Sequence, residues 1–436
     1  MFSGCLRRAV PQRRGRVYDI ESLRPRITAD KIVISRAHVL AFQYWQFGIA
    51  NSVSAIRQRP PVTTYKPFPV YSIEGDAREC GEQYGAQAAD RVARTIEIYL
   101  SAFGRQAKLS LAEVRERAHA FAAQIEALDA GIMAEIGGIA AGAGQKLEDI
   151  VAVNCRTELL YGSLAGTKPA TECTTIIALP EATKGGGVII GKNWDWRDPT
   201  VETVVILRVK QKGKPALSLV VEAGMVGRDG FNEHGIAVCG NLLVSNEDKG
   251  RVGVPIPILR RRILNSRHYY EAIDTLVKSP RGASGNYVIA HRDGVGIDFE
   301  TTPDHVYMMY PERGLLTHAN HFQSPVAQAT GVAKYYTGDS VYRDFRARQL
   351  LEPKIGSITV DDVKAVLKDE FGAPRSICRY PHEYAGAEPT MTIASLVFDL
   401  DAEVMHVAAG QPTRSEYVPV RLPEQDGTKV RAVHAR

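Results

Sequence analysis

The chain has 436 residues, of which 44% are hydrophobic, and this is enough apolar material for one large core or two smaller ones. Its formal net charge is +5, but residues 1–18 carry five arginines and no acid, so the remainder is neutral. A neutral body without a basic stripe argues against nucleic-acid binding. The six cysteines form no Cys-x-x-Cys pair, which favours free thiols in a reducing, cytoplasmic compartment.

Residues 1–69 are predicted to be an N-terminal extension that ends in a proline-rich linker. No apolar segment typical of a secretory signal follows the start, and the alternative to a cytoplasmic location is targeting by the arginine-rich N-terminus. Residues 37–56 lack charged side chains apart from a neutral histidine, but they contain several amides and hydroxyls. This composition fits a membrane span poorly, so no membrane partner is expected.

Helical spacing dominates the next part of the chain. Apolar residues recur at every fourth position along one stripe of residues 77–103, which predicts a helix there. Ser110 and Glu113 form the sequence signature of a capping box, so a second helix should begin after Ser110. A third helical spacing follows and should end where Gly142 and Gly144 interrupt it.

The periodicity changes from helix to strand at Cys173. Two further helical stretches are expected near residues 271–278 and 340–351. The segments predicted as strands are rich in Val, Ile and Tyr: 201–210, 216–222, 236–240, 286–291, 296–301, 305–310, 391–400 and 403–409. Because short turns join many of them, we expect an α+β fold with antiparallel sheets rather than a parallel βαβ array.

Cys173 begins an apolar run that a glycine-containing turn separates from a second apolar run. If these runs form an antiparallel hairpin with Pro180 opposite Val188, then Cys173 lies opposite Asp195. In this register a thiol and a carboxylate would meet across one hairpin. A β-bulge would shift the pairing.

The chain resembles the acyl-coenzyme A:6-aminopenicillanate acyltransferase family, which comprises self-processing N-terminal-nucleophile cysteine hydrolases of peptidase family C45. The resemblance covers about residues 70–420 and rests on the number and order of its motifs. These motifs are Gly81-Glu82-Gln83-Tyr84-Gly85, Asn154-Cys155-Arg156-Thr157-Glu158, Cys173-Thr174-Thr175, Asn193-Trp194-Asp195, Gly230-Phe231-Asn232-Glu233-His234-Gly235-Ile236, Thr317-His318-Ala319-Asn320-His321-Phe322 and Met391-Thr392-Ile393-Ala394-Ser395.

The resemblance implies an αββα sandwich of antiparallel sheets between helical layers, formed by residues 70–436 as one domain. It also implies that the chain cuts itself before Cys173. Residues 70–172 would then be a helical segment of the first fragment, and residues 173–436 would form the catalytic fragment. The expected partners are a small-molecule amide or acyl donor, including an acyl-CoA, and the chain's own cleaved fragment as an αβ heterodimer. No cofactor is expected.

The expected catalytic residues are Cys173, Asp195, Asn320 and Asn241. A thiol needs a base, and self-cleavage would create an α-amino group on Cys173 with a pKa of about 7.7–8.0 that can serve as one. Asp195 would orient the thiol or the new ammonium group. Asn320 would hold the amine or stabilise an oxyanion, and Asn241 is a second candidate donor whose alternative role is that of a turn residue. Arg379 is a candidate substrate-binding residue, with a structural role as its alternative.

Two other functional hypotheses remain open from the sequence. One is a papain-like amide hydrolase without self-cleavage, in which His318 or His321 is the base for Cys173. The other is a non-catalytic relative that uses the pocket to bind a ligand. A metal site is not expected, because no His-Glu-x-x-His pattern accompanies these histidines. The sequence does not distinguish hydrolysis of an amide from transfer of the acyl group to an amine.

Overall fold

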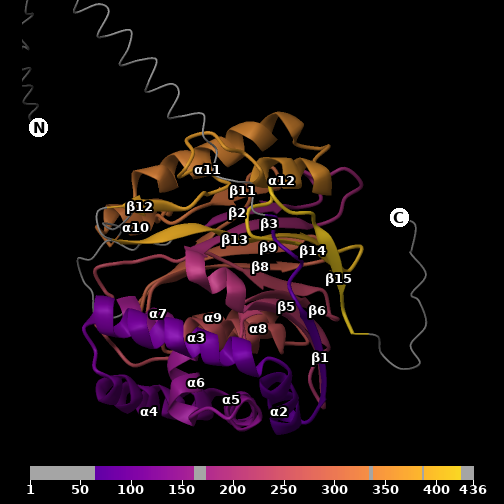
Figure 1. Ribbon diagram of the computed structural model, residues 1–436. Helices are drawn as coiled ribbons and strands as arrows, with labels where there is room; N and C mark the ends of the chain where they lie inside the picture. The colour runs from indigo at the N-terminus through magenta and orange to yellow at the C-terminus, as the bar shows by residue number, and fades with distance from the viewer. Residues whose placement is uncertain (1–63, 162–172, 333–336, 385–386, 424–436) are drawn as a thin grey trace, which may run out of the picture. The chain divides into compact units, whose positions relative to one another are not determined.

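Two β-sheets packed face to face lie at the centre of the fold in the computed structural model (Figure 1). The structure describes residues 64–161, 173–332, 337–384 and 387–423. The predictions for residues 1–63 and for the Glu172 side of the cleavage site lie outside the described residues. The described residues form one compact unit.

The first sheet has eight strands and the second has seven. The strands of the first sheet are, in spatial order, β1 (Val70–Gly75), β4 (Val204–Gln211), β5 (Leu217–Glu222), β6 (Asp229–Asn232), β7 (Ile236–Cys239), β8 (Gly285–His291), β9 (Val295–Thr301) and β10 (Val306–Met309). Those of the second are β11 (Leu315–His318), β2 (Thr174–Ala178), β3 (Ile189–Arg197), β13 (Ala387–Asp399), β14 (Val404–Ala409) and β15 (Val418–Arg421), with β12 (His382–Tyr384) paired to β13.

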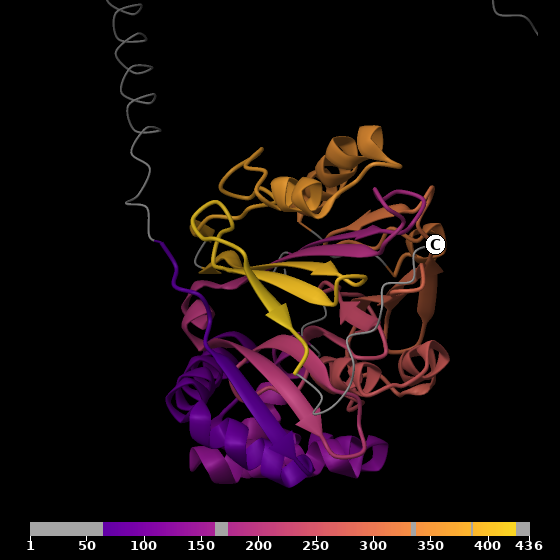
Figure 2. The ribbon, with the colours of Figure 1, turned by 90° about the vertical axis from the view of Figure 1, so that its right-hand side faces the viewer.

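Helices cover the outer face of each sheet, and the two sheets lie between the indigo and orange helices in Figure 2. The layer beside the eight-stranded sheet contains α2 (Ala77–Gln87), α3 (Ala89–Ala102), α4 (Leu111–Leu128), α5 (Ala130–Ala143), α6 (Leu147–Asn154), α7 (Arg156–Tyr161), α8 (Ile256–Leu264) and α9 (Tyr269–Lys278). The other side carries α10 (Pro325–Ala329), α11 (Gly338–Leu351) and α12 (Val360–Leu367). Short helical turns are Phe103–Ala107, Asp198–Thr203 and Glu352–Lys354.

The predicted α+β sandwich of antiparallel sheets between helical layers is therefore confirmed, with one parallel pair, β1 and β4, that was not expected. Helices α2 to α7 and the β2–β3 hairpin separate these two strands in the sequence, and such a long crossover allows the chain to return in the same direction. Of the helices in the described residues, none combines the length and apolar composition that a membrane span requires.

Local signals predicted helices α2 to α5, α9 and α11, whereas α6, α7, α10 and α12 were not predicted. The capping box is formed, since Ser110 Oγ accepts from the Glu113 N–H at 3.3 Å and Glu113 Oε2 accepts from the Ser110 N–H at 2.8 Å. The helix predicted over residues 77–103 is divided at Ala88 into α2 and α3. Helix α8 was not predicted, because three consecutive arginines interrupt its apolar pattern.

Helices α2 and α5 approach each other closely because glycines line both contact faces. A Cβ atom added at Gly81 or Gly85 of α2 would lie 2.1 or 2.4 Å from a backbone oxygen of α5. Added at Gly138 or Gly142 of α5, it would lie 2.3 or 2.2 Å from a backbone oxygen of α2. The Gly81-Glu82-Gln83-Tyr84-Gly85 motif is thus explained by helix packing.

Gly138→Ala should lower the free energy of unfolding by about 1–3 kcal/mol, because its methyl group would meet the Arg78 carbonyl oxygen at 2.3 Å. Gly137→Ala is the matched control on the same helix, since its nearest neighbour would be Arg78 Nη1 at 3.9 Å. The control should gain about 0.5–1 kcal/mol from helix propensity. Thermal unfolding measures both, and equal melting temperatures would contradict the close packing.

Candidate active site

The backbone of Cys173 is held on both sides of the residue. Cys173 directly precedes β2, which lies between β11 and β3, and it is 2% exposed. Its N–H donates to Asn320 Oδ1 at 2.5 Å, and its carbonyl oxygen accepts from Arg343 Nη1 at 2.6 Å. The Cys173 nitrogen, which would be the leaving group in a self-cleavage reaction, therefore has Asn320 Oδ1 as a fixed hydrogen-bond acceptor.

Asn320 reaches Cys173 because β11 pairs with β2, with His318 opposite Thr175. Its side chain is oriented by two further contacts. Asn320 Nδ2 donates to the Leu242 carbonyl at 2.9 Å, and Oδ1 also accepts from Arg343 Nη2 at 3.1 Å. With donors on Oδ1 and an acceptor at Nδ2, the amide oxygen faces the Cys173 nitrogen.

The register of the β2–β3 hairpin differs by one residue from the prediction. Thr174 pairs with Asn193, which puts Cys173 opposite Trp194 and not opposite Asp195. The thiol sulfur lies 3.8 Å from the backbone carbonyl oxygen of Asp195. Both strands are buried on both faces, so an alternating hydrophobic pattern that could specify their register is missing from the sequence.

Asp195 lies with Asn193 on the face of β3 that α12 covers, and Asn193 Nδ2 donates to the Leu367 carbonyl at 2.8 Å. Thr392 Oγ1 donates to Asp195 Oδ1 at 2.6 Å, whereas Oδ2 has no hydrogen-bond partner among the described residues. Burial raises the pKa of Asp195 to about 7, although Arg343 and the Thr392 hydrogen bond act in the opposite direction. Asp195 can therefore exchange a proton near neutral pH.

A buried polar network connects Asp195 to the Cys173 backbone. The Arg379 N–H donates to Thr392 Oγ1 at 2.8 Å, and Arg379 Nη1 lies 3.2 Å from Asp339 Oδ2. The same carboxylate oxygen lies 3.4 Å from Arg343 Nε. Burial lowers the pKa of Arg379 to about 9. Arg379, expected to bind substrate, thus has its guanidinium engaged with a carboxylate on α11.

Arg343 was not identified from the sequence, although it contacts Cys173, Asn320 and Asp339. It is fully buried on α11 and also donates to Thr174 Oγ1 at 2.8 Å. One signal was available. Arg343, Ala347 and Leu351 recur at every fourth position on the buried face of the helix, so a charged residue stands at a core position.

Asn241 follows β7 and contacts Thr175, two residues after Cys173. Its Oδ1 accepts from Thr175 Oγ1 at 2.8 Å, and its Nδ2 donates to the His318 carbonyl at 3.2 Å. Thr175 and Cys173 lie on the same face of β2, toward the other sheet. The structure thus brings Asn241 to the inter-sheet side of the site, one strand position from the thiol.

Both ring nitrogens of His318 contact groups other than the thiol. Nε2 lies 2.9 Å from Glu300 Oε1, and Nδ1 lies 2.8 Å from the Ala319 carbonyl oxygen. Burial alone would lower the pKa of His318, but Asp298 and Glu300 outweigh it and raise the pKa to about 9. A protonated imidazole of this kind is a poor general base at neutral pH.

His321 is held differently, with Nδ1 2.8 Å from Ser340 Oγ. Burial, His318 and Arg343 lower the pKa of His321 to about 3, so its imidazole is neutral. No group of three or more His, Cys, Asp or Glu side chains in the described residues is arranged to hold a metal ion.

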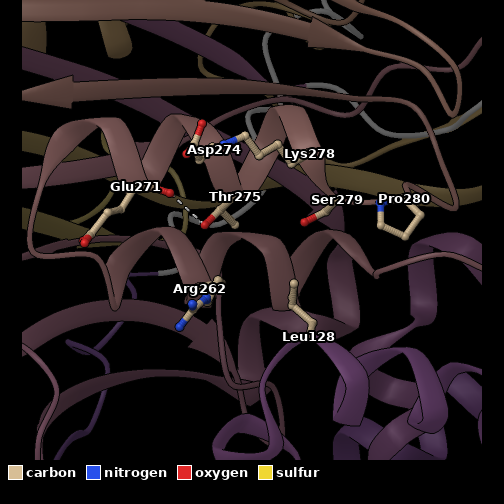
Figure 3. A pocket seen from close by; sticks show the side chains of 8 residues that line it. All are labelled: Leu128, Arg262, Glu271, Asp274, Thr275, Lys278, Ser279 and Pro280. Carbon is tan, nitrogen blue, oxygen red and sulfur yellow. Dashed lines mark hydrogen bonds and ion pairs between the residues drawn. The ribbon is translucent and has the colours of Figure 1, made fainter.

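A surface pocket of about 400 Å³ lies elsewhere, between α8, α9 and the end of α4 (Figure 3). Its lining includes Leu128, Arg262 and Glu271, and none of its residues belongs to the cluster around Cys173. Arg262 and Lys278 there are offset by ion pairs with Asp129 and Asp274. We therefore assign the chemistry to the buried cluster and not to this pocket.

Comparison with known proteins identifies relatives of the chain. Residues 182–414 match the model of the family described as acyl-coenzyme A:6-aminopenicillanic acid acyl-transferase. This segment begins after Cys173 and includes Asp195, Asn241, Asn320 and Arg379. The acyl-coenzyme A:6-aminopenicillanic-acid-acyltransferase 40 kDa form of Emericella nidulans is 27% identical over 349 residues, which are 79% of this chain and 93% of that protein.

Two solved structures are also similar. The N-acylethanolamine-hydrolyzing acid amidase ortholog of Caenorhabditis elegans has a TM-score of 0.39 and 15% identity, covering 52% of this chain and 93% of its own. Penicillin V acylase of Agrobacterium tumefaciens has a TM-score of 0.38 and 16% identity, covering 54% of this chain and 83% of its own.

The His318–Glu300 contact predicts a pH-dependent stability. The pKa of His318 rises from 6.5 to about 9 on folding. The contribution of the protonated imidazole to the free energy of unfolding is therefore complete below pH 6.5 and is lost as the pH rises through 9. His318→Gln should melt at a lower temperature than the parent at neutral pH and should lose less stability between about pH 7 and 10. Parallel melting curves across this range would show that His318 is not charged in the folded protein.

Proposed function

Since the chain belongs to the acyl-coenzyme A:6-aminopenicillanic acid acyl-transferase family, we propose that it is an enzyme with Cys173 as an N-terminal nucleophile. Cys173 becomes N-terminal when the chain cuts itself between Glu172 and Cys173. The mature enzyme accepts an acyl group on the thiol and passes it to water or to an amine. The observation that carries this proposal is the paired contact of the Cys173 backbone with Asn320 and Arg343.

Self-cleavage begins when the Cys173 thiol attacks the carbonyl carbon of Glu172. The bond from that carbon to the Cys173 nitrogen breaks, the nitrogen takes up the thiol proton, and a thioester and a free α-amino group result. Water then hydrolyses the thioester to the Glu172 carboxylic acid and the thiol. Asn320 Oδ1 can accept from this nitrogen before and after the cut, because both an amide and an ammonium group are donors.

The mature site needs no histidine. The α-amino group, with a pKa of about 7.7–8.0, takes the thiol proton during acylation and returns a proton to the departing amine. Asp195 acts through Thr392, Arg379 and Asp339, which connect it to the guanidinium that holds the Cys173 carbonyl. We assign Arg379 to this positioning network. Asn241 orients Thr175 on the side of the site that faces the first sheet.

The substrate is a small-molecule amide or an acyl donor such as an acyl-CoA. Of the two alternative functions, the papain-like one requires a histidine that accepts the thiol proton. His318 has both nitrogens bound elsewhere, and His321 contacts Ser340. The two fragments remain together, because helices of the first bury polar and apolar groups against the second. Arg156 Nη2, for example, lies 2.8 Å from Glu222 Oε2.

The first prediction from this mechanism is that the purified protein consists of two fragments. Cleavage before Cys173 divides the 436 residues into 172 and 264. In proportion to the total of 47.8 kDa, these should have masses of roughly 19 and 29 kDa. Cys173→Ala should remain one chain by intact-mass measurement. A fully active enzyme of undivided mass would contradict the proposal.

The histidines provide the control for the identity of the base. His318→Gln and His321→Gln should each still be cleaved, because the base is the α-amino group. His318→Gln should be less stable for the reason given above, so its cleavage is measured well below its melting temperature. A loss of several orders of magnitude in acylation rate, in a folded variant that has been cleaved, would favour the papain-like mechanism.

Asp195→Asn and Asn320→Ala should slow both self-cleavage and turnover, because the same groups serve both reactions. Asn320→Ala removes the acceptor of the Cys173 nitrogen, which gains positive charge as it leaves the Glu172 carbonyl carbon. Loss of one preorganised hydrogen-bonding group at a developing charge typically costs about 10²–10³ in rate, and we expect this range for Asn320→Ala. Asn246→Ala is the matched control, since Asn246 is exposed and its amide donates only to the Gly331 carbonyl at 3.4 Å. The single-turnover acylation rate is compared with the melting temperature of each variant. Normal acylation in both site variants would make these residues structural.

A further inference from the structure

Positive charge exceeds negative charge in the direct contacts of Asp229, a buried residue of β6. Three cationic side chains surround the carboxylate of Asp229. Lys192 Nζ lies 3.5 Å from Oδ2, Arg260 Nη1 lies 2.9 Å from Oδ1, and Arg228 Nε lies 3.5 Å from Oδ2. The side chains of Lys192 and Asp229 are fully buried. One carboxylate cannot neutralise three cations, and an uncompensated buried charge is costly.

Two of these cations have additional partners. Lys192 Nζ donates to the Gly240 carbonyl, and Arg260 Nη2 donates to the Asn286 carbonyl at 3.4 Å. Arg228 differs from both. Among the described residues, its Nε atom has no hydrogen-bond partner, and its side chain is 11% exposed, against 4% for Arg260 and 0% for Lys192. Of the three cations, Arg228 is therefore the most exposed.

Arg228 is held in place next to the nucleophile. Its Cζ lies 3.5 Å from the centre of the Trp194 ring, and Trp194 is the residue opposite Cys173 across the hairpin. The buried indole Nε1 of Trp194 also has no hydrogen-bond partner among the described residues. Burial lowers the pKa of Arg228 to about 10, whereas Asp229 and Cys173 act to raise it. Because Trp194 lies opposite Cys173, the stacked guanidinium lies on the same face of the hairpin as the thiol.

We propose that Arg228 binds a carboxylate group of the substrate beside Cys173, so that the enzyme prefers amides carrying a carboxylate near the bond that is cut. The proposal rests on the function proposed above. A guanidinium offers parallel N–H donors that match the two oxygens of a carboxylate, and its stacking on Trp194 fixes the plane of the fork. A bound carboxylate would offset the excess positive charge around Asp229.

The carboxylate can belong to the acyl group or to the amine, and two pairs of chromogenic substrates distinguish these sources. One pair is glutaryl 4-nitroanilide and its methyl ester, which differ on the acyl side. The other is phenylacetyl 4-nitroanilide with and without a carboxylate on the nitroaniline ring. For at least one pair, kcat/KM of the parent should be about 10- to 100-fold higher with the carboxylate. This ratio should approach one in Arg228→Gln and recover in part in Arg228→Lys.

Arg94→Gln is the matched control, since Arg94 is a surface arginine on α3 with a side chain that is 41% exposed, and its ratio should equal that of the parent. A ratio near one in the parent for both pairs would overturn the proposal. So would an unchanged ratio in Arg228→Gln. A third outcome would also contradict the proposal. Arg228→Gln would block self-cleavage, and Arg228→Lys would restore cleavage with the same kcat/KM ratio as the parent. The positive charge of residue 228 would then act on the thiol and not on a substrate carboxylate.

Binding separates this proposal from the proposed function. If the parent is not cleaved and turns over none of the substrates, the N-terminal-nucleophile mechanism is wrong, and binding still tests Arg228. Calorimetry with full-length Cys173→Ala should then detect at least about tenfold tighter binding of one carboxylate compound than of its neutral partner. The difference should disappear in the Cys173→Ala, Arg228→Gln double variant. Equal binding of both compounds of each pair would overturn the carboxylate site.

Discussion

The buried guanidinium of Arg343 is the interaction on which the arrangement around Cys173 depends. It donates to the Cys173 carbonyl, to Thr174 and to Asn320, and it contacts Asp339 at 3.4 Å. These contacts tie helix α11 to the first residues of β2 and to the segment after β11. Breaking a buried charge pair of this kind typically costs about 3–5 kcal/mol, so the local backbone has little freedom to rearrange.

The sandwich gives the two faces of the second sheet different electrostatic environments. Toward α11 and α12, Asp195 has a pKa raised to about 7 by burial and is connected through Thr392 to arginines. Toward the first sheet, Cys173 lies near Trp194 and Arg228, where cations predominate. Proton exchange and anion binding can therefore be served by groups on opposite faces of one strand pair, each in a low-dielectric surrounding.

Short-range signals in the sequence predicted much of the fold. The capping box at Ser110, the helical stripes and the strands rich in Val, Ile and Tyr correspond to observed elements, because these features depend on neighbouring residues alone. The family and the α+β fold class are confirmed. The parallel pairing of β1 with β4 and the division of residues 77–103 at Ala88 were not predicted, since they depend on how distant segments pack.

The sequence by itself determined the residue types available for chemistry, and with them the expectation that Asn320 acts near Cys173. Only the tertiary structure decided the register of the hairpin, which puts Trp194 opposite Cys173 and directs Asp195 to Thr392. It also recruited Arg343 from a helix about 170 residues further along the chain, as the sequence separation of the two partners shows. The physical reason is that strands buried on both faces carry no alternating pattern, and that the partner of a buried charge is chosen by proximity in space.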